Sequence, residues 1–329
     1  RGGQASVIRL SIVIATYNRG SVIGKTVENI AAQLSDEVEL LVVDGASTDN
    51  TGDVVQALAA ADQRIRYFRL EQKGGVDKDY CRAVELARGE FCWLFTDDDF
   101  FRDGAVSEVL KAIGEGHDLI VVNLDVFDKT MQKQIDSSFI KLAEDKCYDR
   151  NTLDDLVVET MHCLTFIGSV IIRRSLWLER EKEKYFGTEF IHVGVIFQKP
   201  VPGTVKVIAR PLVNYRYGMA QWSARGFKIW MFKWPELVWS FDCISDKAKS
   251  AVCRREPWRS LWTLLVQRSI GTYSFEVFKE LLVRKDATRT WKLMAIFIAL
   301  LPKKLVQWGH CLYTLSRDKK SRDFFAARN

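Results

Sequence analysis

The stretch Phe91-Cys92-Trp93-Leu94-Phe95-Thr96-Asp97-Asp98-Asp99 places five apolar residues just before three consecutive carboxylates. A short apolar run that ends in a turn is typical of a buried strand, so the acids would follow the carboxyl end of that strand. Ligands of open α/β sheets bind beyond the carboxyl ends of the strands. The stretch therefore predicts a buried strand with a polar site at residues 97–99.

The same order of strand and polar turn occurs twice earlier in the chain. Residues 10–15 are apolar and end in Thr16-Tyr17-Asn18-Arg19-Gly20, and residues 39–44 end in Asp44 before the loop Gly45-Ala46-Ser47. We expect further strands at 65–70, 118–122, 163–172 and 205–212, and helices at 21–34, 51–61, 77–88, 103–115 and 152–161. This alternation predicts an α/β fold, with a mostly parallel sheet flanked by helices.

The polar residues at these strand ends suit a phosphorylated ligand. Carboxylates such as Asp97–Asp99 are ligands for hard cations like Mg²⁺ or Mn²⁺, which offset the charge that develops on a leaving diphosphate. Asp44 can accept a hydrogen bond from a base or a ribose hydroxyl, and the Tyr17 ring can stack near a base. Taken alone, the triple Asp could also be an acidic surface turn.

Three segments together, residues 11–19, 42–49 and 87–99, resemble glycosyltransferase family 2 with the GT-A (Rossmann-like) fold. The resemblance covers residues 8–125 strongly and extends more weakly to 220. It implies a nucleotide-diphospho-sugar donor, a Mn²⁺ or Mg²⁺ cofactor, and direct transfer of the sugar to an acceptor hydroxyl. The implied donor-binding residues are Thr16, Tyr17, Asn18, Arg19, Asp44, Gly45, Ser47, Gly75, Asp77, Lys78, Asp97 and Asp98.

The metal ligands implied by the resemblance are Asp97, Asp98 and Asp99, with one position of register left open. The family pattern Asp-x-Asp-Asp puts Thr96 at the first Asp, whereas the shifted register reads Asp97-x-Asp99. In the segment Gly74-Gly75-Val76-Asp77-Lys78, Asp77 would bond donor hydroxyls, and Lys78 or Arg82 would face phosphate. Simple capping of the next helix by Asp77 is the alternative.

The resemblance places the catalytic base in residues 186–194, where Glu189 and His192 are the two candidates. They stand three residues apart and would share one face of a helix. An acid or an imidazole can deprotonate an acceptor hydroxyl, and we rank Glu189 ahead. The alternative is a solvated Glu189 and a structural His192. The polymerase signature Gln-x-x-Arg-Trp is missing, which favours addition of a single sugar.

A narrower resemblance links the chain to abequosyltransferase-like enzymes of bacterial O-antigen assembly. It rests on Gly74-Gly75-Val76-Asp77, the Asp97–Asp99 triplet and Phe190-Ile191-His192-Val193. It implies a CDP-3,6-dideoxyhexose donor and a polyprenyl-diphosphate-linked oligosaccharide acceptor.

The C-terminal third differs from the rest in charge and in tryptophan content. The whole chain has a net charge of +6, while residues 221–329 carry 21 Lys and Arg against 9 Asp and Glu, a difference of +12, with eight of the ten tryptophans. We expect a catalytic domain at 1–220 and a basic helical extension at 221–329. Such a composition favours a peripheral position on an anionic membrane surface, although a helical subdomain with buried Trp residues is the alternative. No nucleic-acid-binding motif is present, so a nucleic-acid partner is not expected.

The remaining sequence features concern the location of the protein. The longest apolar run in the C-terminal region, Leu293–Leu301, has nine residues, and a spanning helix needs about 20. Residues 1–4 lead into no signal peptide, and the seven cysteines form no Cys-x-x-Cys pair, so we expect reduced thiols. The predicted location is cytoplasmic, on the inner face of a bacterial plasma membrane.

Two other functions fit the sequence less well. A nucleotidyltransferase would carry a Gly-rich phosphate loop with several basic residues early in the chain, and residues 16–24 offer only Arg19. A noncatalytic sugar- or lipid-binding scaffold would not need the carboxylates Asp44 and Asp97–Asp99. Metal-dependent hydrolysis of a donor would separate an enzyme from such a scaffold.

Overall fold

The computed structural model describes residues 7–219, 225–315 and 323–324, so residues 1–6 and Trp222 lie outside it. One sheet runs through the molecule in the order β3-β2-β1-β4-β9-β6-β10-β5, with β7 paired to β6 and β8 to β10. The strands are β1 (Leu10–Thr16), β2 (Val38–Asp44), β3 (Ile65–Arg69), β4 (Phe91–Phe95), β5 (Phe100–Phe101), β6 (Leu119–Phe127), β7 (Gln134–Asp136), β8 (Lys146–Tyr148), β9 (Val170–Arg173) and β10 (Val205–Arg216).

The N-terminal half of the sheet is parallel, as the sequence predicts. Strands β3, β2, β1 and β4 pair in parallel, and the register places Thr16 beside Asp44 and Ile14 beside Phe95. Every residue of β2 and β4 is buried, which explains their continuous apolar runs, because a strand covered on both faces needs no polar alternation.

The second half contains antiparallel pairs that the sequence does not reveal. Strand β9 lies between β4 and β6 and is antiparallel to both, whereas β6 and β10 are parallel. The expected strand at 163–172 is wrong over most of its length, because a turn and a 3₁₀ segment (Ile167–Ser169) precede β9. The indole N–H of Trp93 donates to the carbonyl of Gly168 (2.8 Å) and anchors this buried turn to β4.

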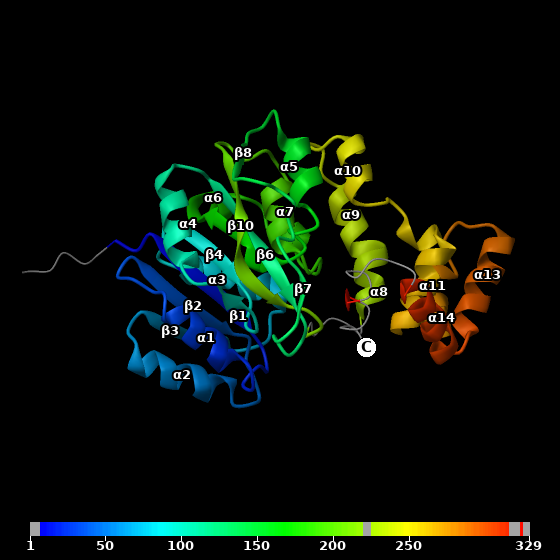
Figure 1. Cartoon of the computed structure of the whole chain (residues 1–329), viewed down its shortest axis with the longest axis horizontal. Helices are drawn as coiled ribbons and strands as arrows, with labels where there is room; N and C mark the ends of the chain where they lie inside the picture. Colours follow the sequence, from blue (N-terminus) through cyan, green and yellow to red (C-terminus); the bar gives the residue numbers. More distant parts are fainter. Residues whose placement is uncertain (1–6, 220–224, 316–322, 325–329) are drawn as a thin grey trace, which may run out of the picture.

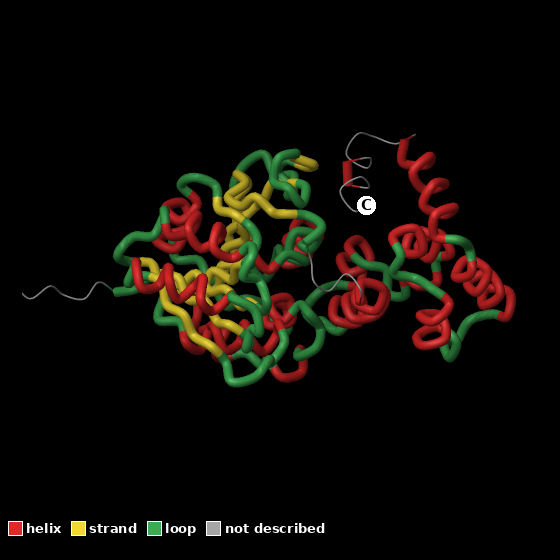
Figure 2. The backbone as a smooth tube through the Cα atoms, turned by 90° about the horizontal axis from the view of Figure 1, so that it is seen from below, coloured by secondary structure: helices red, strands yellow, loops and turns green. Residues whose placement is uncertain are grey.

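Helices flank the strands of this sheet (Figures 1 and 2). Helix α3 packs on β1 and β2, α2 packs on β3, and α4 packs on β6 and β10. These helices are α1 (Ile23–Ala31), α2 (Thr51–Ala61), α3 (Val76–Leu86), α4 (Ala105–Gly114), α5 (Leu153–Thr160), α6 (Arg174–Glu179) and α7 (Ile191–Phe197), with a 3₁₀ turn at Glu183–Tyr185.

The C-terminal region is helical. Its helices α8, α9 and α10 lie beside the sheet domain, and α11, α13 and α14 lie farther out, at one end of the long axis (Figure 1). Its α-helices are α8 (Gly226–Lys228), α9 (Trp234–Trp239), α10 (Asp246–Val252), α11 (Leu261–Ile270), α12 (Phe275–Val277), α13 (Arg289–Leu300) and α14 (Lys303–Leu315). π-Helical segments span Ile229–Lys233 and Phe278–Leu282, and a 3₁₀ turn spans Pro257–Arg259.

Two hydrophobic clusters divide the interior. The larger holds the sheet and extends through Trp234, Phe241 and Ala248, so α9 and α10 pack against the sheet domain. The smaller cluster is built around Trp258, Leu264 and Tyr273, together with residues of α13. The domain boundary at residue 220 stays a prediction. The packing places Ile229 and the buried apolar residues of 234–248 with the larger core, whereas Phe227 and Met231 belong to the smaller cluster. Within the described residues, no helix has the length and apolar character needed to cross a bilayer.

Candidate active site

The three predicted polar turns meet at one edge of the sheet. Strand β1 lies between β2 and β4, and all three run in the same direction, so their carboxyl ends are neighbours. Residues 16–19, 44–49 and 96–99 therefore come together, as the strand pattern predicts.

The turn at Asp97–Asp99 is held by side chains from β1 and by the end of β10. Thr16 donates its hydroxyl to Asp97 (2.8 Å), and Arg19 donates from Nε to Asp97 (2.9 Å) and from its other end to Asp98. The Thr96 hydroxyl and the backbone N–H of Arg216 both donate to Asp99. Arg216 is a residue of this site that the sequence alone did not indicate.

The pKa values of two of these carboxylates are raised. Burial, reinforced by the Asp97 charge, raises the pKa of Asp98 to about 6. Burial and the charge of Asp98 raise the pKa of Asp99 well above its usual range. The side chains of Arg19, Asp97 and Asp98 are only 11–14% exposed, and the positive charges of Arg19 and Arg216 offset only part of the effect of burial on the pKa of Asp98.

The donor set fits a hard divalent cation. Among the residues that the structure describes, no three acidic, His or Cys side chains already surround a common point. Mg²⁺ is usually held by one or two carboxylates together with water and substrate phosphates, so a preformed protein cage is not required. One or two of Asp97–Asp99 would hold the ion. The pKa values of Asp98 and Asp99 are raised first by burial and then by the neighbouring acids, and a bound cation would offset both effects.

Asp44 fixes the second turn. Its side chain is fully buried, and Oδ1 accepts the backbone N–H of Ser47 (2.7 Å) while Oδ2 accepts the Tyr67 hydroxyl (2.7 Å) and Arg69 (3.3 Å). Ser47 in turn accepts the backbone N–H of Asn18 (2.9 Å). The Asp44 carboxylate thus joins the turns after β1 and β2 to β3.

The backbone at these turns is close and locally left-handed. Gly45 donates its N–H to the carbonyl of Thr16 (2.9 Å), and Asn18 has a φ of 53°. A Cβ at position 45 would stand 2.8 Å from the carboxylate of Asp79. A side chain at position 45 would therefore require the Asp79 carboxylate to move.

Asp79 is a second residue that the sequence reading missed. Its carboxylate lies against Gly45 and Gly74, and its Oδ1 is buried without a hydrogen-bond partner among the described residues. Burial raises its pKa to about 6. The signal in the sequence was a second acid in the first turn of the helix, four residues after Gly75.

Tyr17 and Lys78 each contact a neighbour through an aromatic ring. The ammonium group of Lys73 lies 3.6 Å from the centre of the Tyr17 ring. Because Tyr17 follows β1, it lies at the same edge of the sheet as Asp44 at the end of β2. Lys78 lies over the ring of Phe186 (5.5 Å). Arg82, the other candidate for phosphate, forms an exposed ion pair with Glu85 (3.0 Å).

Asp77 is occupied by the backbone of a distant turn. Its Oδ2 accepts the N–H groups of Gly187 (2.7 Å) and Glu189 (3.0 Å), and its Oδ1 accepts that of Ile191 (3.2 Å). Burial, with the nearby Glu189 charge, raises its pKa. Gly75 precedes it with a φ of 89° and begins α3. In this structure Asp77 positions the turn before α7.

Glu189 lies in that turn, with an unusual backbone φ of 72°. Its Oε1 pairs with Arg225 (2.9 Å) and with Lys233 (3.2 Å), two cations from the C-terminal region that the sequence did not connect with it. The side chain is 12% exposed, so it retains some access to solvent.

The shared helix face expected for Glu189 and His192 is wrong, because α7 begins at Ile191 and leaves Glu189 outside it. His192 is instead a core residue, only 1% exposed, and its Nε2 donates to the carbonyl of Leu164 (2.7 Å). Burial lowers its pKa to about 4. A side chain so enclosed cannot meet an acceptor hydroxyl, which leaves Glu189 as the candidate base.

Comparisons with known proteins agree with this geometry. Residues 11–176 match the family model "Glycosyl transferase family 2". The chain is 34% identical over 110 residues to the GalNAc(5)-diNAcBac-PP-undecaprenol beta-1,3-glucosyltransferase of Campylobacter jejuni, which is 33% of this chain and 36% of that protein. It is 24% identical over 221 residues to abequosyltransferase RfbV of Salmonella typhimurium, covering 63% of this chain and 66% of that protein. The matches thus span less than two thirds of these relatives.

A solved structure supports the fold. The mannosyltransferase PcManGT from Pyrobaculum calidifontis, in complex with GDP-Man and Mn²⁺, superposes with a TM-score of 0.57 over 97% of this chain and 84% of that chain, at 13% identity.

Proposed function

Because the chain belongs to glycosyl transferase family 2, we propose that it is a metal-dependent enzyme that moves one sugar from a nucleotide-diphospho-sugar to a hydroxyl of a lipid-linked oligosaccharide. The observation that carries this proposal is the meeting of Asp97–Asp99 with Thr16, Arg19 and the Asp44 turn at one edge of the sheet. The process it serves is the synthesis of O-antigen or a similar cell-surface polysaccharide.

The nucleoside occupies the turns after β1 and β2. Tyr17 lies beside the base, and the turn that Asp44 and Ser47 fix with Asn18 holds the base and ribose through backbone and side-chain polar groups. Gly45 allows the close approach that this contact needs. Gly75 and Lys78 lie toward the donor sugar and diphosphate.

One or two of Asp97–Asp99 would hold the cation, which would supply positive charge to neutralise the departing nucleoside diphosphate. Arg19 can donate hydrogen bonds to the negatively charged diphosphate, because its guanidinium already lies against Asp97 and Asp98 and can turn toward a phosphate oxygen. The buried position of the acids strengthens each of these interactions, since charges interact more strongly away from water.

Glu189 accepts the proton of the acceptor hydroxyl. It is the partly exposed acid of residues 186–194, and Asp77 fixes its backbone through three N–H groups of the same turn. Arg225 and Lys233 hold the carboxylate from the opposite side. His192 supports the core beneath this turn and takes no part in proton transfer.

The donor sugar is a CDP-3,6-dideoxyhexose and the acceptor is linked to a polyprenyl diphosphate. The similarity to a protein named as an abequosyltransferase supports the first part, and the similarity to a protein whose name includes an undecaprenol-linked acceptor supports the second. The enzyme then works on the cytoplasmic side of a bacterial membrane, where nucleotide sugars and lipid-linked acceptors meet.

A thermal-shift panel of CDP, UDP, GDP and dTDP, each with and without Mn²⁺, tests the donor site. A ligand that binds only the folded state raises the melting midpoint by mass action. We expect a Mn²⁺-dependent rise that is largest for CDP. A rise for another nucleotide would replace the CDP assignment and keep the enzyme. No rise for any of the four would contradict the donor site and favour a noncatalytic scaffold.

A further inference from the structure

Among the residues that the structure describes, most of the exposed large apolar side chains lie in one region of the chain. Of the fifteen such residues, ten lie between Trp262 and Tyr313, and the other five are scattered over the remaining chain. Isolated apolar residues are normal on a protein surface, whereas a concentration of them marks an interaction site.

Helix α13 exposes one apolar stripe. Leu293 (64% exposed), Phe297 (59%) and Leu300 (61%) follow one another at spacings of four and three residues, so they lie on one face of the helix. Met294 borders this stripe and is 44% exposed. The opposite face, with Ala295 and Ile298, is buried in the smaller hydrophobic cluster.

Helix α14 repeats the arrangement. Leu305 (56% exposed), Trp308 (64%) and Leu312 (48%) stand at spacings of three and four residues. Both α13 and α14 pack against α11, so both stripes lie on the outside of the same group of helices. We call these seven residues the apolar face: Leu293, Met294, Phe297, Leu300, Leu305, Trp308 and Leu312.

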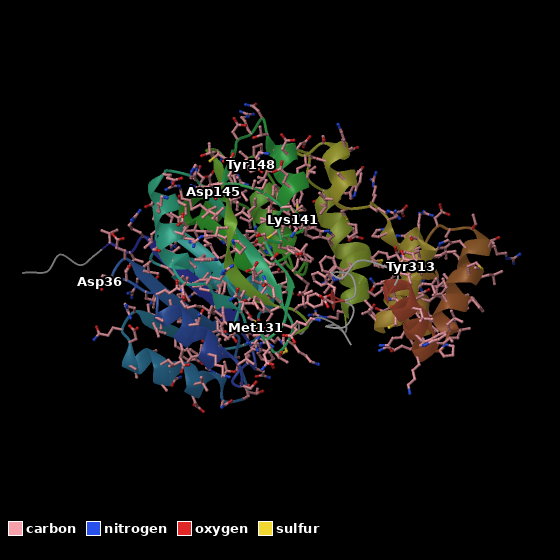
Figure 3. The ribbon with its side chains drawn as sticks, viewed as in Figure 1. Asp36, Met131, Lys141, Asp145, Tyr148 and Tyr313 are labelled. Atoms are coloured by element: carbon pink, nitrogen blue, oxygen red, sulfur yellow. The ribbon has the colours of Figure 1, made fainter. Side chains whose placement is uncertain are left out.

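An aromatic pair lies beside the apolar face. Trp262 of α11 is 50% exposed, and its ring meets that of Tyr313 at 4.8 Å in an edge-on contact. Tyr313 lies among the C-terminal helices, on the other side of the molecule from Asp36 along the long axis (Figure 3). Trp and Tyr are the side chains that accumulate where a membrane meets water.

The charges around the apolar face have one sign. Residues 287–315 contain Arg289, Lys292, Lys303 and Lys304 and no Asp or Glu. Arg289 stands one turn before Leu293, and Lys304 stands one turn before Trp308, so each stripe begins with an exposed basic residue. Basic residues beside exposed apolar ones suit the surface of an anionic bilayer.

A second copy of the chain is a poorer partner for this face. A two-fold contact sets a surface against itself, so the basic residues of one copy would meet those of the other without an acid between them. An anionic lipid surface offers acyl chains to the stripes and negative headgroups to the basic residues.

We infer that the apolar face of α13 and α14 docks the enzyme on an anionic lipid bilayer. The two helices lie along the interface with their stripes among the upper acyl chains, and Arg289 and Lys304 contact the headgroups. The inference adds a specific lipid-binding surface to the proposed function, and it rests on that function only for the need to reach a lipid-linked acceptor.

The test is co-sedimentation of the full chain with vesicles of phosphatidylethanolamine containing about one-third phosphatidylglycerol, without donor or acceptor. We expect the wild type to bind, and the double variant Phe297→Glu with Trp308→Glu to lose about tenfold or more in partitioning. The matched control is Val158→Glu with Leu178→Glu, two exposed apolar residues of the sheet domain (45% and 38%), which should bind like the wild type. Arg289→Glu with Lys304→Glu should weaken binding to these vesicles but not to neutral ones.

Circular dichroism and transfer to a water-soluble acceptor check that each variant is folded and active, so failure of the docking surface is distinguishable from failure of the proposed function. Equal binding by the wild type and the Phe297→Glu, Trp308→Glu variant would overturn the inference, as would no binding by the wild type. Light scattering covers the remaining case. A wild-type dimer that this variant converts to a monomer, with unchanged vesicle binding, would make the face a self-association surface.

Discussion

The backbone N–H of Glu189 donates to the carboxylate of Asp77 over 3.0 Å, between residues 112 positions apart in the chain. Two more N–H groups of the same turn, from Gly187 and Ile191, donate to this carboxylate. The first turn of α3 therefore determines where the candidate base stands. This contact gives Asp77 a positioning role that does not require it to touch a substrate.

Replacing Asp77 tests that role. Asp77→Ala removes the acceptor of three N–H groups, of which that of Ile191 is in a buried hydrogen bond, and we expect a loss of about 2 kcal/mol in unfolding free energy and a fall in kcat of tenfold or more. Asp77→Asn keeps one carbonyl oxygen as an acceptor and should restore part of both. Urea unfolding and steady-state kinetics measure the two effects, with the exposed Glu85→Ala on the same helix as the control. If Asp77→Ala changes KM for the donor and leaves kcat intact, Asp77 binds the donor instead.

The base itself is tested by a pair of matched changes. Glu189→Gln should lower kcat by about 10²- to 10⁴-fold, because a positioned base contributes that much to proton transfer. His192→Gln preserves a donor for the carbonyl of Leu164 and should keep kcat within about threefold of the wild type, since His192 is buried away from any acceptor. The opposite ranking of the two variants would restore His192 as the base.

Asp98 should limit stability at neutral pH when no cation is bound. Burial raises its folded-state pKa to about 6, above the ordinary value of an aspartate, so the unfolded chain releases the proton first and stability falls as pH rises from about 4 to about 6. Asp98→Asn should therefore be more stable than the wild type by roughly 2 kcal/mol at pH 7.5, and nearly equal at pH 4.

Melting curves at both pH values check this expectation, with the exposed Glu144→Gln as the control. Asp98→Asn should also lose the Mn²⁺-dependent rise in melting midpoint with nucleotide, and most of the transfer activity. Unchanged turnover in a folded Asp98→Asn enzyme would contradict the assignment of Asp98 to the metal site.

Tyr67 should influence nucleotide binding without touching the nucleotide. Its hydroxyl donates to the buried Asp44 carboxylate (2.7 Å), so Tyr67→Phe should cost about 1–2 kcal/mol of stability and loosen the turn at residues 45–47. We expect a several-fold rise in the Kd of the nucleotide by titration calorimetry. Tyr148→Phe is a suitable control, because it removes a comparable hydrogen bond, to Glu159, and Tyr148 lies on β8, which is not one of the strands that carry the nucleotide-binding turns. Equal nucleotide affinity in both variants would contradict the proposal that the turn held by Asp44 binds the nucleotide.

The sequence predicts the parallel half of the sheet well, because its strands are continuous apolar runs separated by helical periodicity. It also predicts that residues 16–19, 44–49 and 97–99 share an edge, since parallel strands end on the same side. The antiparallel β9 escapes prediction, because its place between β4 and β6 depends on pairing across the whole domain. The run 163–172 is mostly apolar, with Thr165 and Ser169 as its polar members, and burial of a turn produces much the same pattern as burial of a strand.

The site residues that sequence reasoning missed share one property. Asp79, Arg216, Arg225 and Lys233 act through neighbours that are distant in the chain or through backbone atoms. His192 shows the reverse case, since a spacing of three residues suggested a shared face, while only the fold reveals that the imidazole is enclosed. Motif spacing locates a site, but burial decides which of its members meet solvent.

The contact of Arg19 with Asp97 and Asp98 has a consequence for the order of loading. The guanidinium acts as an internal counterion, so a free divalent ion must compete with a tethered charge for the same oxygens. A diphosphate offers Arg19 a new anionic partner and thereby vacates those oxygens. Ion and nucleotide should consequently enter as a complex, and the resting protein should resist capture of stray cations from its surroundings.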